Sequence, residues 1–224
     1  METVYLIFIK DDAWLTILKG LGATVQISVL SLVFGTLLGA GICYLRVSSF
    51  KTAKIFAQTY IAVIRGSPVL MLLMLMFYGV FARTELTPIT VAVITFSMHT
   101  GAYVAELLRS SLMAVDKGQV EAARTLGFSK IQAFRLVALP QIIHIAKPVY
   151  QSTIINLIQW TSVVGYVSIT DLTRVINNTA ARTMQPMITI IGGIIIYLAL
   201  SYIVHGIFSW SDKIERRKRE KSKL

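Results

Sequence analysis

The side chains that could carry chemistry in this 224-residue chain are few and widely separated. His99, His144 and His205 lie far apart, and the single cysteine, Cys43, lies inside an apolar run, so neither a disulfide nor a metal site is predicted. The sequence contains no nucleophile–base arrangement and no phosphate loop of the type G-x-x-x-x-G-K-[ST]. We therefore predict no catalytic residue, no metal and no ATP site, and do not expect this chain to be an enzyme.

Polar side chains inside an apolar run are stronger candidates, because such groups are costly in lipid and usually face a cavity or another helix. The most polar run lies at about 149–169. We interpret its polar residues as candidates for lining a solute pathway, while hydrogen bonds between helices are an equally weighted alternative. The candidates are Asn156, Gln159, Thr161 and Ser162.

Two further groups of residues are candidates for a structural or gating role. Glu106 and Arg109 are three residues apart, which places them on one helix face and predicts an ion pair. Arg65 and Pro68 lie within an apolar run, where the Gly-Ser-Pro sequence after Arg65 predicts a break or kink.

The elements that hold these residues are predicted to be membrane-spanning helices. The mean hydropathy is +0.68 and only 15% of the residues are charged, whereas a soluble domain carries about 25%. A spanning helix needs about 20 mostly apolar residues. In the first run, Gly35 and Gly39 predict close packing of a neighbouring helix. We expect an all-α integral membrane protein with about five spans, at about 21–45, 55–81, 88–108, 149–169 and 187–210.

Basic residues predict the orientation of these spans. Sixteen Lys and Arg lie in 46–54, 109–147 and the tail, and five lie on the other side. This asymmetry predicts a cytoplasmic C-terminus and an external N-terminus. The formal net charge of +11 is concentrated at span ends and in the tail, which favours anionic lipid over nucleic acid as its partner. The predicted organisation is an external or interfacial segment (1–19), a membrane domain (20–210) and a basic cytoplasmic tail (211–224).

The cytoplasmic stretch at about 109–141 is predicted to form a helix–turn–helix element. Helix-forming residues occupy 119–126 and 130–138, and Gly127 lies where a helix C-terminus commonly places glycine. Ser129 is predicted to cap the second helix and Pro140 to end it.

Within this stretch the chain resembles the permease subunits of ATP-binding-cassette (ABC) importers. Their signature, E-A-A-x3-G-x9-I-x-L-P, is matched at the correct spacing, with Val137 in place of isoleucine. The matching residues are Glu121, Ala122, Ala123, Gly127, Leu139 and Pro140.

Other elements resemble the polar amino acid branch of that family, and the resemblance covers about residues 20–210. Ile64-Arg65-Gly66-Ser67-Pro68 is similar to its arginine-glycine-threonine/serine-proline element. The run from Ala102 to Arg109, followed by Lys117, Gly118 and Gln119, is also similar. Gln159-Trp160-Thr161-Ser162-Val163 aligns with a lysine-acid-threonine-serine-leucine element, of which the charged pair is lost.

The resemblance implies a multi-pass protein of the bacterial cytoplasmic (inner) membrane that imports polar amino acids. Its implied partners are a second permease subunit, as a homodimer or heterodimer, a separate ATPase subunit that holds ATP and Mg²⁺, and an extracytoplasmic solute-binding protein. It also implies that the ATPase grips the helix around Glu121–Gly127. The coupling set is therefore Gly118, Gln119, Glu121, Ala122, Ala123, Gly127, Leu139 and Pro140.

Two alternatives remain open. A secondary transporter or channel would work without an ATPase, but such proteins often show inverted repeats, and none is evident in this sequence. A membrane scaffold would not need a polar run at 149–169.

Overall fold

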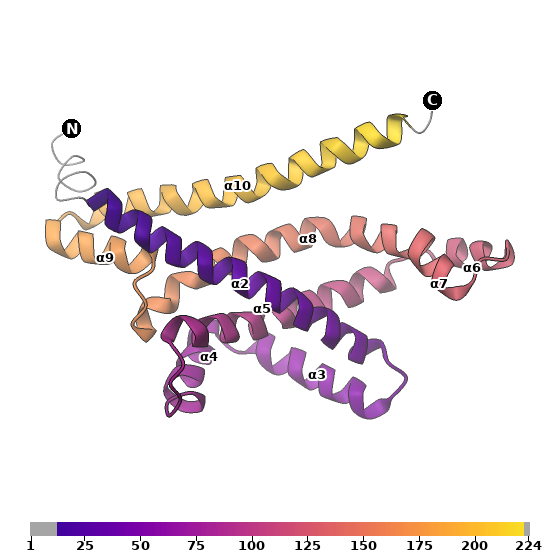
Figure 1. Ribbon diagram of the computed structural model, residues 1–224, viewed down its shortest axis with the longest axis horizontal. Coiled ribbons are helices and arrows are strands. Elements are labelled where there is room, and N and C mark those ends of the chain that lie inside the picture. Colours follow the sequence, from indigo (N-terminus) through magenta and orange to yellow (C-terminus); the bar gives the residue numbers. More distant parts are fainter. Residues whose placement is uncertain (1–12, 222–224) are drawn as a thin grey trace. The chain divides into compact units, whose positions relative to one another are not determined.

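The structure, a computed structural model, describes residues 13–221 (Figure 1), and the expectations for residues 1–12 and 222–224 lie outside the described residues. Every element in the described range is a helix, which confirms the predicted all-α class. The elements are α2 (Ala13–Val47), α3 (Lys51–Gly66), α4 (Val69–Leu75), the π-helix η2 (Met76–Val80), α5 (Pro88–Met113), α6 (Lys117–Thr125), α7 (Lys130–Ala133), the π-helix η3 (Phe134–Ala138), α8 (Leu139–Trp160), the 3-10 helix η4 (Thr161–Val167), α9 (Leu172–Thr183) and α10 (Pro186–Lys221).

Three described helices are long and apolar enough to cross a membrane: Ala13–Val47, Pro88–Met113 and Pro186–Ile214. A fourth span arises if α3 is joined to the helix Val69–Val80, from which it is bent by 107°. This bend confirms the predicted break. The expected fifth span is not among these candidates; α8 carries several polar side chains and ends at Trp160, where η4 takes over.

The predicted helix end at Pro140 is wrong. The chain passes from α7 through η3 into α8, and Pro140 is the second residue of α8. The Leu139 N–H donates to the Phe134 carbonyl, five residues back, so the helix is widened just before the proline. A wider turn accommodates a proline ring and its missing N–H better than a regular α-turn does.

The described chain divides into two compact units, and each is described by itself. Unit 1 holds the described residues up to Val29, then Leu73–Val93 and the residues from Ile154 onward. Unit 2 holds Leu30–Leu72 and Ile94–Thr153.

In unit 2, α2 and α5 pack closely at two glycines. A Cβ atom added at Gly39 would lie 2.7 Å from the Val104 Cβ and 2.8 Å from the Gly101 carbonyl oxygen. A Cβ at Gly35 would lie 2.9 Å from the Thr100 Cβ. The close approach predicted from the glycine spacing is therefore confirmed. A core of small and branched side chains continues from this seam and consists of Ile42, Cys43, Ala57, Ile61 and Ala105.

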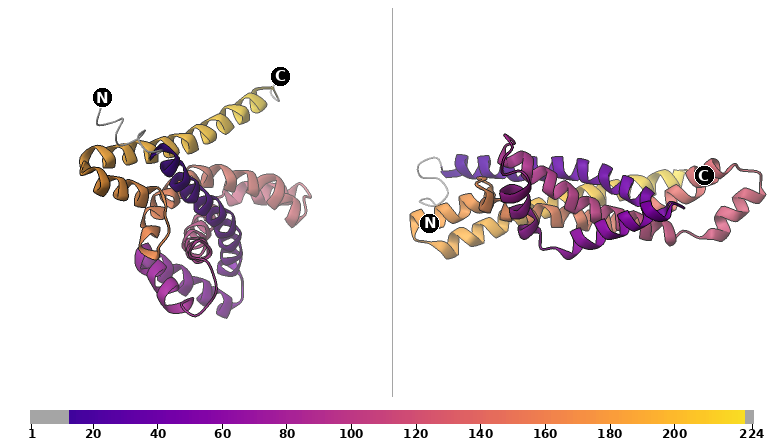
Figure 2. Two further views of the ribbon diagram at one scale, coloured as in Figure 1. Left: turned by 60° about the vertical axis from the view of Figure 1, so that its left-hand side comes forward. Right: turned by 90° about the horizontal axis from the view of Figure 1, so that it is seen from below.

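In unit 1, α9 folds back on the first turns of α10, as Figure 2 shows. The Thr173 and Tyr197 hydroxyls lie 2.8 Å apart across this hairpin, and a Cβ atom at Gly193 would meet the Ile176 side chain at 3.1 Å. A small core of Ile17, Leu172, Val175 and Ile176 joins α2 to α9.

Candidate functional site

Helix α6 is held at its first turn by Asp116. The Asp116 side chain is the N-cap and accepts a hydrogen bond of 2.9 Å from the Gly118 backbone N–H. A capping carboxylate satisfies a donor that has no partner within the helix. The helix therefore starts at Lys117, two residues before the predicted start at Gln119. The cap at Asp116 is a sequence signal that the prediction missed.

The C-terminal end of α6 is closed by Gly127. This residue has φ +90°, a left-handed conformation that suits glycine. Its N–H donates to the Arg124 carbonyl, and the Phe128 N–H donates to the Ala123 carbonyl. These two bonds form a Schellman motif, which satisfies carbonyls that the helix end would leave without partners. The predicted glycine-ended helix is confirmed.

Helix α7 begins with a reciprocal cap. The Ser129 hydroxyl accepts from the Gln132 N–H at 3.2 Å, while the Gln132 side chain accepts from the Ser129 N–H at 2.8 Å. This capping box confirms the predicted cap at Ser129. The turn between α6 and α7 is thus fixed from both sides.

The α6–α7 element presents an open surface. Gly118, Gln119, Glu121, Ala122 and Gly127 are exposed, and Ala123 is buried against the rest of the element. Five large apolar side chains that follow are also exposed to between 38% and 80%, which is unusual for a segment outside the spans. They are Leu126, Phe128, Ile131, Phe134 and Leu136, and we call them the apolar patch.

The first turn of α8 contacts α6 through a side-chain hydrogen bond. The Gln141 side chain donates to the Gln119 side-chain oxygen at 3.1 Å and to the Val137 carbonyl at 3.0 Å. Leu139 is half-buried and Pro140 is exposed beside this contact. Figure 1 shows α6 and α7 at the N-terminal end of α8. The Gln141 side chain therefore links α6 to the first turn of α8.

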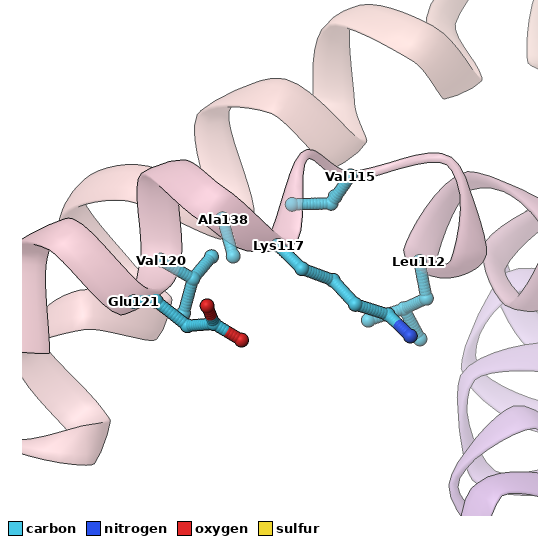
Figure 3. Close-up of a pocket in the computed structure, with 6 residues that line it drawn as sticks. All are labelled: Leu112, Val115, Lys117, Val120, Glu121 and Ala138. Atoms are coloured by element: carbon cyan, nitrogen blue, oxygen red, sulfur yellow. The ribbon is translucent and has the colours of Figure 1, made fainter.

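A pocket of about 270 Å³ lies between α6 and the end of α5. Figure 3 shows the Lys117 and Glu121 side chains extending from α6 among the residues that line it. Its other walls are apolar: Leu112, Val115, Val120 and Ala138. The pocket thus combines an apolar floor with one cation and one anion.

Glu106 and Arg109 form the predicted ion pair. The Arg109 Nε lies 3.0 Å from the Glu106 Oε2, and a second guanidinium nitrogen bonds the other carboxylate oxygen. Both side chains are about a quarter exposed. Two parallel hydrogen bonds fix the geometry of such a pair.

Arg65 does not join that ion pair. It lies in the last turn of α3, and its guanidinium stacks 4.9 Å from the centroid of the Tyr103 ring. Pro68 lies within the break, directly before α4 begins at Val69, and the Ser67 hydroxyl donates to the Val63 carbonyl at 2.8 Å.

The four pathway candidates belong to unit 1 and differ in exposure. Asn156 and Gln159 are exposed and lie on one face of α8, three residues apart. Ser162 is half-buried. Thr161 is fully buried, and its hydroxyl donates to the Ile158 carbonyl at 2.6 Å. Asn156 and Gln159 are therefore the two exposed residues among the four candidates.

A set of hydrogen bonds after η4, which the sequence did not indicate, holds the backbone next to these candidates. Ser168 has φ 64° and ends η4, and the Arg174 guanidinium donates to the Gly165 carbonyl at 2.9 Å. The buried Asp171 carboxylate accepts from the Thr173 and Arg174 N–H groups, and its burial raises the pKa of that carboxyl. The Thr24 hydroxyl accepts from the Leu172 N–H at 3.2 Å.

Comparisons with known proteins agree with this arrangement. A probable amino-acid ABC transporter permease protein, YckA of Bacillus subtilis, is 34% identical over 188 residues, covering 84% of this chain and 83% of YckA. The L-cystine transport system permease protein TcyB of the same organism is 30% identical, covering 93% and 89%. A solved amino acid ABC transporter with histidines has a TM-score of 0.80 and 31% identity over 90% of this chain and 94% of its own.

A more distant solved structure shares the fold. A chain of the MetNI methionine ABC transporter, in an inward-facing conformation, has a TM-score of 0.75 at 18% identity and covers 93% of this chain. Residues 31–217 match the family described as the binding-protein-dependent transport system inner membrane component. This match covers about half of α2, the later spans, the α6–α7 element and the pathway candidates. The chain therefore belongs to the family of membrane-embedded permease subunits of binding-protein-dependent ABC transport systems.

Proposed function

We propose that this chain is the permease subunit of an ATP-driven importer of polar amino acids. Support comes from relatives named for amino-acid, L-cystine and arginine transport. The observation that carries the mechanism is α6, a short helix capped at both ends, with Glu121 and Ala122 exposed and its side tied to α8. Such an element can transmit the motion of a partner as a rigid body.

The partner that grips α6 is a separate ATPase subunit, which holds ATP and Mg²⁺. The apolar patch supports this role, because large exposed apolar side chains outside a span mark a protein contact. Closure of the ATPase pushes on α6, α6 moves α8, and α8 carries Asn156 and Gln159. A second permease subunit and an external solute-binding protein complete the assembly.

The proposed orientation places α6, α7 and the basic end of α10 in the cytoplasm of a bacterium and the N-terminus outside. The basic residues of 46–54, 109–147 and the tail support it. In a Cys43→Ala background, labelling of single cysteines introduced at Ala122 and Arg83 with a membrane-impermeant thiol reagent in intact cells tests it. Reaction at position 83 alone is expected, and reaction at position 122 would contradict the orientation.

Purification of the assembled complex tests the function. We expect a nucleotide hydrolase to co-purify with this chain and proteoliposomes to take up an amino acid only with ATP inside and the binding protein present. Replacing the catalytic glutamate of the ATPase with glutamine is the matched control and should abolish uptake. Uptake that persists with that variant, or without any hydrolase, would favour a secondary transporter or channel.

Asn156 and Gln159 offer a separate prediction about the pathway. We expect Asn156→Ala or Gln159→Ala to raise the solute concentration for half-maximal uptake about five- to tenfold, since a lost hydrogen bond costs about 1 kcal/mol or more in a desolvated site. Gln151→Ala, which lies on the same helix, is the control. An unchanged apparent affinity and rate would assign both side chains to helix packing.

A further inference from the structure

The guanidinium of Arg65 lies deep within a membrane-spanning segment. It stacks on Tyr103, which precedes Met113, the last residue of α5, by ten residues. At 1.5 Å per residue this is about 15 Å from the helix end, and the hydrocarbon core of a bilayer is about 30 Å thick. Tyr103 therefore lies well inside the candidate span Pro88–Met113. The cation over its ring lies at the same depth.

Arg65 is also exposed at this depth. A charged side chain in the membrane interior faces a water-filled cavity or a polar partner rather than acyl chains. Stacking on an aromatic ring compensates only part of the cost of removing such a cation from water. The exposed side of Arg65 therefore requires an aqueous cavity or a polar partner.

The backbone beside Arg65 supports the same conclusion independently. The chain breaks by 107° between Gly66 and Val69, and a Cβ atom added at Gly66 would meet nothing within 4 Å. Non-helical backbone at membrane depth is tolerated only where it is buried in protein or lines a water-filled cavity. Gly66 is exposed, so burial in its own chain is excluded.

The charge of this region is unbalanced in favour of cations. Arg46 and Arg65 both act electrostatically on the Glu106 carboxylate, whose two oxygens already accept from Arg109. Both oxygens of the Glu106 carboxylate are therefore engaged by Arg109, and the Arg65 guanidinium lies over the Tyr103 ring instead. The site is suited to a small anion.

We propose that Arg65, held in place by Tyr103, binds the carboxylate group of the transported solute. A guanidinium matches a carboxylate with two parallel hydrogen bonds, which lysine does not reproduce. The Tyr103 ring lies against the guanidinium, and the Arg65 side chain is otherwise exposed. This inference rests on the proposed function, because it takes an amino acid as the solute. It assigns a binding role to a residue of unit 2, apart from the unit 1 candidates.

Direct binding to the purified permease–ATPase complex tests the proposal without the selectivity of the binding protein. Radiolabelled L-cystine and the twenty standard amino acids are each tested on the wild-type complex, and the solute that binds is then used with its α-carboxamide derivative. We expect wild type to bind the carboxylate form at least tenfold more tightly than the amide. Arg65→Gln should weaken binding of the carboxylate form at least tenfold and reduce that preference to less than twofold.

Two further variants test whether an effect of Arg65→Gln comes from lost hydrogen bonds to the carboxylate or only from lost charge. Measurements of assembly then test whether the variant folds. Arg65→Lys keeps the charge and should retain part of the affinity and of the preference. Lys54→Gln removes an exposed cation near the start of α3, eleven residues before Arg65, and should change affinity by less than twofold. Assembly with the ATPase and basal ATP hydrolysis, measured on each variant, report folding.

The outcomes are distinguishable. If wild type binds and transports an amino acid and Arg65→Gln binds it with unchanged preference, the assignment of Arg65 is overturned while the proposed function stands. If Arg65→Gln assembles poorly but Arg65→Lys binds without any loss of preference, Arg65 is a packing residue and the assignment is again overturned. If wild type neither binds nor transports any of these solutes, the proposed function itself fails.

Discussion

Replacing Gly127 with valine is expected to lower solute-stimulated ATP hydrolysis and uptake roughly tenfold or more while the protein stays in the membrane. Gly127 has φ +90°, and a residue with a branched Cβ adopts the left-handed region only at a cost of about 1–2 kcal/mol or more. The Schellman bonds at the end of α6 would open, and the helix proposed as the contact with the ATPase would lose its fixed end. A shift of about 1.4 kcal/mol changes an equilibrium tenfold.

Gly127→Asn is the matched control, because asparagine tolerates left-handed backbone better than other residues with a Cβ. The space around Gly127 is open, as no heavy atom lies within 4 Å of an added Cβ, so steric clash does not complicate the comparison. We expect the asparagine variant to keep most of the coupling. Normal solute-stimulated hydrolysis in Gly127→Val would remove α6 from the coupling mechanism.

Replacing Gly39 with leucine is expected to prevent correct packing of unit 2. Even the first carbon of the new side chain would lie 2.7 Å from the Val104 Cβ and 2.8 Å from a backbone oxygen, so the helices would have to separate. Overpacking a tight contact costs about 1–3 kcal/mol, and a backbone seam belongs at the upper end of that range. A loss of about 3 kcal/mol lowers the midpoint of thermal unfolding by about 6–12 °C in a chain of this length.

Gly41 on the same helix supplies the control. A Cβ atom there would meet nothing within 4 Å, so Gly41→Leu should leave the yield of folded protein and the thermal midpoint almost unchanged. Size-exclusion profiles of the detergent-purified variants after heating measure both quantities. Equal stability of the two leucine variants would contradict the seam between α2 and α5.

The features that local sequence determines were predictable. Gly127 and Ser129 specify a helix end and a helix start by short-range hydrogen bonds, so their roles followed from residue type and spacing. Arg65-Gly-Ser-Pro specified a break for the same reason. The spans with long apolar runs were also predictable, because transfer of a helix into lipid depends on the summed hydrophobicity of about 20 consecutive residues.

Features that depend on tertiary surroundings were not predictable. Pro140 stays within a helix because a π turn precedes it, and propensity alone does not indicate such a turn. Thr161 was grouped with Asn156 and Gln159 by polarity, but its burial depends on packing within unit 1. The stacking of Arg65 on Tyr103 joins residues 38 positions apart and required the fold.

Helix α10 runs as one element of 36 residues from Pro186 to Lys221, although its apolar candidate span ends at Ile214. Such a rod is about 54 Å long, so a change in tilt of about 10° about one end would sweep the other through roughly 9 Å. A small change in the tilt of the span would therefore displace the basic C-terminal end of α10 by several ångströms. A spin label at Lys213, paired with a second label on α9, would turn that sweep into a distance change readable during each round of nucleotide hydrolysis.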